Sequence, residues 1–88
     1  MKNMCFVCGY DDLPEPPFDE YGVGSDVLCP CCAFQYGLDD YEYEDKKTAF
    51  EEWRKKWIKQ GYYWFTSSPK PPYNWNPSKQ LENIKEMP

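Results

Sequence analysis

Hydrophobic positions recur with helical spacing in one segment of the chain. Phe50, Trp53 and Trp57 lie at positions i, i+3 and i+7, and charged residues fill most of the positions between them. One face of a helix carries residues at this spacing, so the pattern predicts an amphipathic helix over residues 48–60. The aromatic stripe is expected to pack on the rest of the protein rather than to form a ligand site.

The predicted helix has recognisable ends. Thr48 followed by Glu51 fits a capping box, in which each side chain binds a backbone N–H of the first turn. Gly61 is the residue type that most often ends a helix. These signals bound the element at residues 48–60.

An aromatic and proline-rich stretch follows over residues 61–76. It opens with four consecutive rings, Tyr62, Tyr63, Trp64 and Phe65. Two of the four are expected to pack inward and two to face solvent or a partner. The prolines further on predict an extended strap across the domain. Asn76 and Pro77 then read as the N-cap and first residue of a short helix over residues 77–85.

The five cysteines form two matching motifs. Cys5 and Cys8 are followed by a small residue and an aromatic residue, and so are Cys29 and Cys32. Two C-x-x-C turns separated by about 20 residues are typical of a structural zinc site. Each turn can chelate one edge of a tetrahedron. The predicted ligands are therefore Cys5, Cys8, Cys29 and Cys32, within a double knuckle over residues 1–38.

Other uses of these cysteines stay open. Iron is the alternative metal, because two such turns also build a rubredoxin-like iron site. Disulfides would need an oxidising compartment. A thioredoxin-like motif lacks its surrounding β-α-β pattern. Cys31 aligns with Val7 rather than with a ligand, and reads either as an apolar filler or surface thiol or as a reactive, exchanging ligand.

The two knuckles differ at one position. Gly9 follows the first pair and can adopt a positive φ freely, whereas Ala33 follows the second pair. The second knuckle is therefore expected to be strained or differently shaped.

Composition and charge limit the classes of function. The chain of 88 residues has a net charge of −5 and no histidine, so nucleic-acid binding is disfavoured. No catalytic triad or phosphate-binding loop is present, and four thiolates would close the metal shell; an enzyme is not expected. Residues 37–45 are acidic and read as a solvated loop or as a patch for a basic partner.

We expect a single domain over residues 1–88 with a small metal-stapled α+β fold. Its double knuckle, zinc-ribbon or rubredoxin-like, would be covered by one main helix and a short C-terminal helix. Short strands are expected near residues 23–28 and 2–6. The opening residues show neither a signal peptide nor a membrane span, so the cytoplasm is the expected compartment.

The chain resembles the CPCC type of small, cysteine-rich bacterial proteins. The resemblance covers nearly the whole chain and is carried by both knuckles and by motifs in the later half, chiefly Cys5-x-x-Cys8-Gly9-Tyr10, Cys29-Pro30-Cys31-Cys32-Ala33-Phe34, Trp53-Arg54-Lys55-Lys56-Trp57 and Trp75-Asn76-Pro77. Phe6 and Ala33 depart from the proline and glycine usual in that family. The resemblance suggests an immunity role against a bacterial toxin.

The expected function is that of a non-enzymatic protein-interaction module. Its partner would be a basic protein, with a homodimer as a second expectation because exposed rings pair readily. The expected binding residues are Asp39, Asp40 and Glu42 of the acidic loop and Tyr62, Tyr63 and Trp64 of the ring cluster. A rubredoxin-like electron carrier and a zinc-ribbon regulator are the alternatives.

Overall fold

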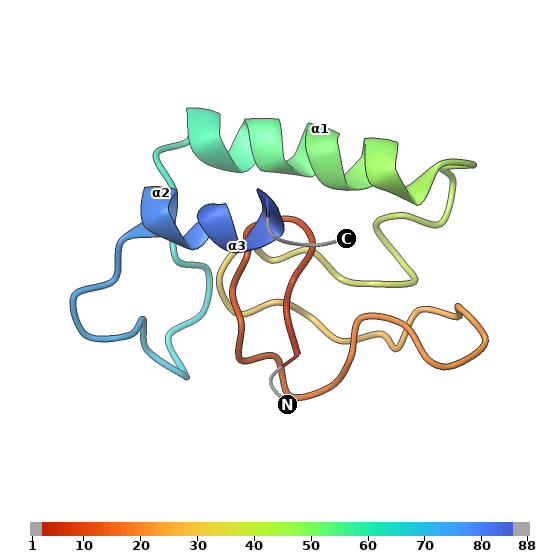
Figure 1. Ribbon diagram of the computed structural model, residues 1–88, viewed down its shortest axis with the longest axis horizontal. Coiled ribbons are helices and arrows are strands. Elements are labelled where there is room, and N and C mark those ends of the chain that lie inside the picture. The colour runs from red at the N-terminus through yellow and green to blue at the C-terminus, as the bar shows by residue number, and fades with distance from the viewer. Residues whose placement is uncertain (1–2, 86–88) are drawn as a thin grey trace.

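A computed structural model describes residues 3–85 and contains one long helix and two short ones. Helix α1 spans Lys46–Lys59, α2 spans Pro77–Gln80 and α3 spans Glu82–Lys85. In Figure 1, α1 lies along one side of the molecule, and the loops of the N-terminal half lie beneath it. The small, compact shape agrees with the predicted fold, with less strand than expected.

Helix α1 begins two residues before the predicted start. Asp45 is the N-cap, and its Oδ1 accepts a hydrogen bond from Lys47 N at 3.0 Å. The predicted capping box at Thr48 is therefore wrong, because Asp45 provides an equally good cap one turn earlier. The Thr48 hydroxyl instead donates to Asp45 Oδ2 at 3.3 Å. The other end is as predicted, with Gly61 at a φ of +91°.

One face of α1 forms much of the core. Ala49 and Trp57 are buried, while Phe50 and Trp53 are half-buried and pack against the core cluster. The Phe50 ring lies 5.6 Å from that of Phe34, centroid to centroid. The aromatic stripe predicted from the sequence is therefore the packing face of this helix.

The predicted strands at residues 23–28 and 2–6 are absent from residues 3–85. Isolated antiparallel bridges take their place, joining Asn3 to Leu13, Phe18 to Gly24 and Leu28 to Gln35. Residue 2 lies outside the described residues. The prolines and glycines of the intervening chain interrupt any longer ladder. The β component of the expected α+β fold is thus reduced to single bridges.

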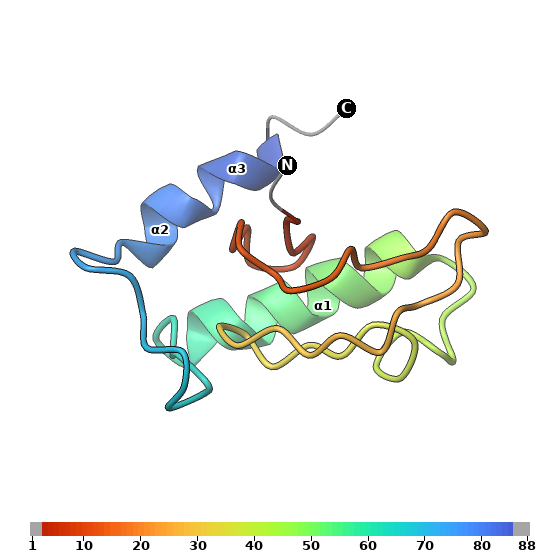
Figure 2. The same cartoon turned by 90° about the horizontal axis from the view of Figure 1, so that it is seen from below.

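The C-terminal helix divides into α2 and α3 at Leu81. Asn76 caps α2 through its side chain, which accepts from Lys79 N, and Pro77 occupies the first turn as predicted. Figure 2 shows the N-terminal loop between α1 and the α2–α3 pair. This placement brings two separate helical elements against the first pair of cysteines.

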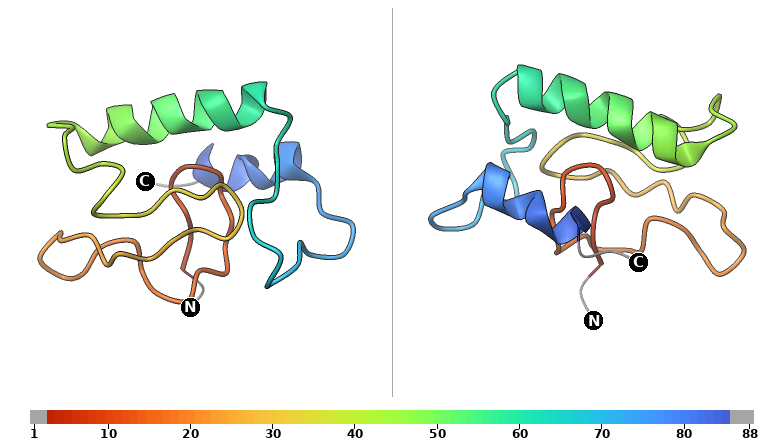
Figure 3. Two further views of the ribbon diagram at one scale, coloured as in Figure 1. Left: turned by 180° about the vertical axis from the view of Figure 1, so that it is seen from behind. Right: turned by 45° about the horizontal axis from the view of Figure 1, so that its top comes forward.

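The segment over residues 61–76, which we call the strap, is tied to the second knuckle at residues 65 and 66, whereas its proline stretch over residues 67–72 is exposed. Phe65 N donates to Cys31 O at 2.9 Å and Thr66 N donates to Pro30 O at 3.0 Å, so its backbone is tied to the second knuckle. Figure 3 shows this segment descending from the end of α1 past the loops. None of the helices among the described residues has the length and apolar character needed to cross a membrane.

Candidate metal centre

The two C-x-x-C motifs fold into the same backbone turn. We call residues 5–10 knuckle 1 and residues 29–34 knuckle 2. In each, the N–H of the fifth residue donates to the carbonyl of the first cysteine at 3.0 Å. The N–H of the first cysteine donates to the carbonyl of the sixth residue, at 2.7 Å in knuckle 1 and 3.0 Å in knuckle 2. The sequence alignment of the motifs therefore corresponds to a structural repeat.

The fifth position of each knuckle has a left-handed backbone. Gly9 has a φ of +84° and Ala33 a φ of +69°. A residue with a Cβ atom pays about 1–2 kcal/mol for this conformation. The sequence predicted that knuckle 2 would be either strained or differently shaped. It is strained at Ala33, but its hydrogen-bonded turn has the same form as that of knuckle 1.

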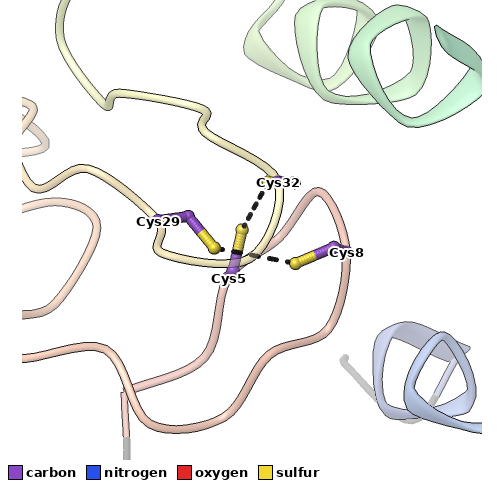
Figure 4. A group of neighbouring side chains, drawn as sticks. All are labelled: Cys5, Cys8, Cys29 and Cys32. Atoms are coloured by element: carbon purple, nitrogen blue, oxygen red, sulfur yellow. Dashed lines mark hydrogen bonds between the residues drawn. The ribbon is translucent and has the colours of Figure 1, made fainter. Parts of the chain in front are cut away.

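The four predicted ligands converge on one point. The sulfur atoms of Cys5, Cys8, Cys29 and Cys32 all lie within 4.8 Å of one another. Cys5 Sγ is 3.8 Å from Cys32 Sγ, and Cys8 Sγ is 3.7 Å from Cys29 Sγ. Figure 4 shows each knuckle contributing one sulfur to each of these pairs.

These separations fit a tetrahedral metal. A zinc–sulfur bond of about 2.3 Å places the sulfurs of a tetrahedron about 3.8 Å apart. A disulfide would need about 2.05 Å, and all five cysteines are free thiols. The four side chains are fully buried, so an ion at their centre would be shielded from water. The four cysteines could therefore bind a metal ion, and their chemistry suits zinc or iron.

The surroundings act unequally on the four thiols. Burial is the main cause that raises the pKa of Cys8 and of Cys32 well above the usual value of 9.0. Burial also tends to raise the pKa of Cys5. Hydrogen bonds with Cys29, Cys32, Cys8 and Tyr36 outweigh this effect and bring the pKa of Cys5 well below 9.0. Of Cys5, Cys8 and Cys32, Cys5 is thus the one whose surroundings favour the thiolate.

Knuckle 1 is held by long polar side chains from two helical elements. From α1, Arg54 Nε donates to Val7 O and its Nη2 donates to Phe6 O, both at 2.7 Å. From the C-terminal helices, Gln80 Nε2 donates to Cys8 O at 3.0 Å and Asn83 Nδ2 donates to the next carbonyl at 2.9 Å. Four consecutive carbonyl groups, those of residues 6–9, are therefore satisfied by side chains.

Knuckle 2 is held by aromatic side chains and by the strap. Trp53 Nε1 and the Tyr63 hydroxyl both donate to Cys32 O, at 2.8 and 2.9 Å. The backbone of residues 65 and 66 binds the carbonyls of residues 31 and 30. Of the predicted binding rings, Tyr63 is therefore a structural support of knuckle 2.

Cys31 lies outside the four-sulfur group. It is fully buried, so the reading as a surface thiol is wrong. Its sulfur accepts a contact from Gln80 Nε2 at 3.5 Å. The corresponding residue of knuckle 1 is Val7, which is also fully buried. Burial of both favours the reading of Cys31 as a small apolar filler.

The acidic residues predicted to bind a partner divide into different roles. Asp40 is fully buried, and its Oδ1 accepts from Gly37 N at 2.8 Å. Its expected place on a binding surface is therefore wrong, because its carboxylate closes a turn. Asp39 is half-buried and its Oδ2 accepts from Gln35 N at 2.7 Å. Glu42 is exposed, as expected.

The predicted binding rings are also more enclosed than expected. Tyr62, Tyr63 and Trp64 are half-buried and pack against the core, and Phe65 is the exposed member of the run. The division into two inward and two outward rings is therefore wrong. The run packs three rings because knuckle 2, Trp57 and Tyr10 each offer a surface to it.

A separate group of exposed apolar side chains lies around Tyr41. Tyr41 is 78% exposed and Leu38 is 64% exposed. Tyr41 borders two hollows: one of about 460 Å³ that also includes Leu38, Asp39 and Glu42, and one of about 380 Å³ that also includes Val23. We call the surface around these two hollows the Tyr41 face. The sequence placed acids here but did not single out this tyrosine.

No family model, curated protein or solved structure matches this chain. Its chemistry is therefore inferred from its own residues. Those that sequence reasoning missed include Tyr36 and Arg54. Tyr36 could have been suspected only from its place in an aromatic cluster, and Arg54 only as a charge beside the helix stripe.

Proposed function

We propose that this protein is a small zinc protein that acts as a non-enzymatic protein-interaction module. Cys5, Cys8, Cys29 and Cys32 would hold one structural zinc ion. The observation that carries the proposal is the closed, buried group of four sulfurs with tetrahedral separations. The resemblance to the CPCC type and its immunity role against a toxin remain predictions from the sequence.

A structural role is favoured over a catalytic one by the ligand set. Catalytic zinc sites keep one position open for water or substrate, whereas four thiolates fill all four positions. Bound zinc would supply folding free energy, on the order of 10 kcal/mol. Both knuckles anchor the helices and the strap through their carbonyl groups, so fixing the knuckles fixes the rest of the domain.

The Tyr41 face is the best-supported interaction surface. An exposed tyrosine beside apolar Leu38 offers the aromatic contact area that anchors many interfaces. Glu42 and Asp39 place negative charge at the same hollow. A basic protein would complement this charge, in keeping with the net charge of −5.

The metal can be tested on protein purified without added metal. We expect about one zinc per chain by elemental analysis, and loss of helical circular dichroism when a strong chelator removes it. Cys29→Ala should abolish zinc binding. Cys31→Ala is the matched control, since it removes a buried thiol outside the four-sulfur group, and it should retain the metal.

Other results of this measurement would redirect the proposal. Iron in place of zinc, with a reversible one-electron couple, would move the rubredoxin-like electron carrier to first place. A metal-free protein whose cysteines are all free and whose fold survives chelation would contradict a structural metal.

The interaction surface can be tested by affinity capture with matched variants. We expect a basic protein to be retained by the wild type and lost with Tyr41→Ala or Glu42→Lys. Tyr73→Ala is the control, because Tyr73 is also highly exposed but does not line either hollow of the Tyr41 face. Equal loss with Tyr73→Ala would argue against this face, and salt-sensitive capture of DNA or RNA would favour the zinc-ribbon regulator.

A further inference from the structure

The hydroxyl group of Tyr36 lies against the four-sulfur group. Tyr36 is fully buried. Its hydroxyl oxygen is 3.0 Å from Cys5 Sγ and 2.8 Å from Phe6 N. A tyrosine hydroxyl has one proton to donate and lone pairs that accept. Two partners therefore lie within hydrogen-bond distance of one hydroxyl group, which can both donate and accept.

The chemistry of the two partners decides that orientation. Phe6 N is a backbone N–H and can only donate, so it occupies a lone pair of the hydroxyl oxygen. The hydroxyl proton is then left for Cys5 Sγ, the other group within reach. A tyrosine hydroxyl is protonated near neutral pH, so this proton is present to be donated.

The ring that carries the hydroxyl is fixed on several sides. The Phe34 ring packs edge-on at 4.8 Å and the Phe18 ring at 5.6 Å, centroid to centroid. The Tyr36 backbone donates to Val27 O at 3.1 Å and accepts from Asp26 N at 2.9 Å. The donor is therefore held in position by the packing of the folded chain, and its hydrogen bond costs little side-chain entropy.

Cys5 differs from the other three ligands in this respect. Within residues 3–85, the sulfurs of Cys8, Cys29 and Cys32 have no hydroxyl partner. A hydrogen bond from an O–H stabilises the negative charge of a thiolate and fixes the orientation of its sulfur. Partners of this kind, outside the ligand set, orient metal ligands and tune the metal.

We propose that Tyr36 is a positioning residue of the metal centre, whose hydroxyl donates a hydrogen bond to the Cys5 thiolate and slows release of the metal. This inference rests on the proposed metal site. Loss of such a partner typically weakens metal affinity about 10- to 100-fold. Tyr36→Phe should therefore release the metal about 10- to 100-fold faster than the wild type.

A spectroscopic test can detect the hydrogen bond in the unmodified protein. Cadmium replaces zinc in thiolate sites and is visible by NMR. We expect the cadmium signal of the loaded wild-type protein to show scalar coupling to the Tyr36 hydroxyl proton, transmitted through Cys5 Sγ. A Tyr36 that only fills space would give no such coupling, and its absence would overturn the proposal even if the variant failed to fold.

A kinetic test compares two tyrosines that both support the knuckles. Transfer of cadmium to an excess of a coloured chelator would be followed for the wild type, Tyr36→Phe and Tyr63→Phe. The Tyr63 hydroxyl donates to Cys32 O rather than to a sulfur. We expect Tyr36→Phe to release the metal about tenfold faster or more, and Tyr63→Phe to change the rate by less than about threefold. Equal acceleration by both would overturn the special role of Tyr36.

The result also separates this proposal from the one on which it depends. If the wild-type protein fails to bind cadmium or zinc, the metal site and the role of Tyr36 are both wrong. If the wild type binds the ion but shows no coupling, and Tyr36→Phe releases it at the wild-type rate, the metal site stands and only the role of Tyr36 is wrong.

Discussion

Knuckle 1 and knuckle 2 share a backbone turn but are held by different kinds of contact. Knuckle 1 has its carbonyl groups bound by Arg54, Gln80 and Asn83. Knuckle 2 is bound by aromatic side chains and by the backbone of the strap. Helix α1 contributes to both sets, through Arg54 to knuckle 1 and Trp53 to knuckle 2. The side chains of the first set are polar and those of the second are aromatic.

This difference shows what a C-x-x-C motif does and does not specify. The motif and the small residue after it encode the turn, which is why both knuckles have the same internal hydrogen bonds. The surroundings are encoded elsewhere in the chain, so each knuckle tolerates different changes. Substitutions that affect one knuckle and spare the other test the comparison directly.

The largest effect is expected at the fifth position of knuckle 1. A Cβ atom on Gly9 would lie 2.3 Å from the backbone oxygen of Gln80, so the α2 helix would have to move. Gly9→Ala should lower the free energy of unfolding by about 3 kcal/mol, from backbone strain and the loss of about two hydrogen bonds. Urea denaturation of the metal-loaded protein measures this change.

Gly22→Ala is the matched control for that substitution. Gly22 also has a positive φ, of +78°, but a Cβ atom there would meet nothing within 4 Å. It should cost only the backbone term, about 1 kcal/mol. Similar losses for the two variants would mean that the contact between Gly9 and α2 has little energetic weight.

The next expected effect is a dependence of zinc affinity on pH, to which both knuckles contribute. Cys8 and Cys32, one in each knuckle, have a pKa raised above 9.0 by burial, so each must lose a proton before it can bind a metal near neutral pH. Affinity for zinc should therefore rise with pH, and these two thiols alone contribute about 100-fold per pH unit, at one factor of ten per proton.

Competition with a chelator whose own proton binding is known, between about pH 6 and about pH 8, measures this dependence. Removing a single ligand would leave a shallower slope. An affinity that stayed constant over this range would contradict protonated thiols at both positions.

A smaller effect is expected from the charged support of knuckle 1. Arg54→Met keeps the aliphatic packing of the side chain but leaves Phe6 O and Val7 O without their donors. The free energy of unfolding should fall by about 2 kcal/mol, the range for hydrogen bonds from charged groups. Lys55→Met, at an exposed position of the same helix, should change it by less than about 0.5 kcal/mol.

The smallest effect is a gain of stability in knuckle 2. Ala33 has a φ of +69°, and glycine adopts this conformation without the Cβ penalty. Ala33→Gly should raise the free energy of unfolding by about 0.5–1 kcal/mol, since relief of strain exceeds the added entropy of the unfolded chain. Thermal melts of the wild type, Ala33→Gly and Ala49→Gly measure the sign of the change in stability. Ala49→Gly is the control, because it should destabilise helix α1. A loss of stability in both variants would show that Ala33 is not strained.

The parts of the fold that depend on local spacing could be predicted from the sequence. The four ligand cysteines follow from the repeated motif, and Trp57 follows from the helical stripe; both are where the pattern predicts. Asp40 could not be placed in this way. An aspartate in an acidic run reads as solvated, but the N–H of Gly37 binds its Oδ1 and Lys46 Nζ lies 4.0 Å from its buried Oδ2.

The supports of the metal site were beyond sequence reasoning for a different reason. Arg54 and Tyr36 contact knuckle 1 from 47 and 31 residues away in the chain, and no local pattern links such positions. The strand prediction failed because bridges such as that between Leu28 and Gln35 involve one pair each. Alternation over a few residues does not distinguish a single bridge from a strand.

The distance along the chain between knuckle 1 and its supports has a consequence during synthesis. Gln80 and Asn83 lie 72 and 74 residues after the carbonyl groups that they bind. A ribosome adds about 5–20 residues per second, so all four ligand cysteines enter the nascent chain several seconds before these side chains exist. During that interval the carbonyl groups of Cys8 and Gly9 lack the side chains that bind them in the folded protein. Knuckle 1 can therefore reach its final environment only after nearly all of these 88 residues have been made.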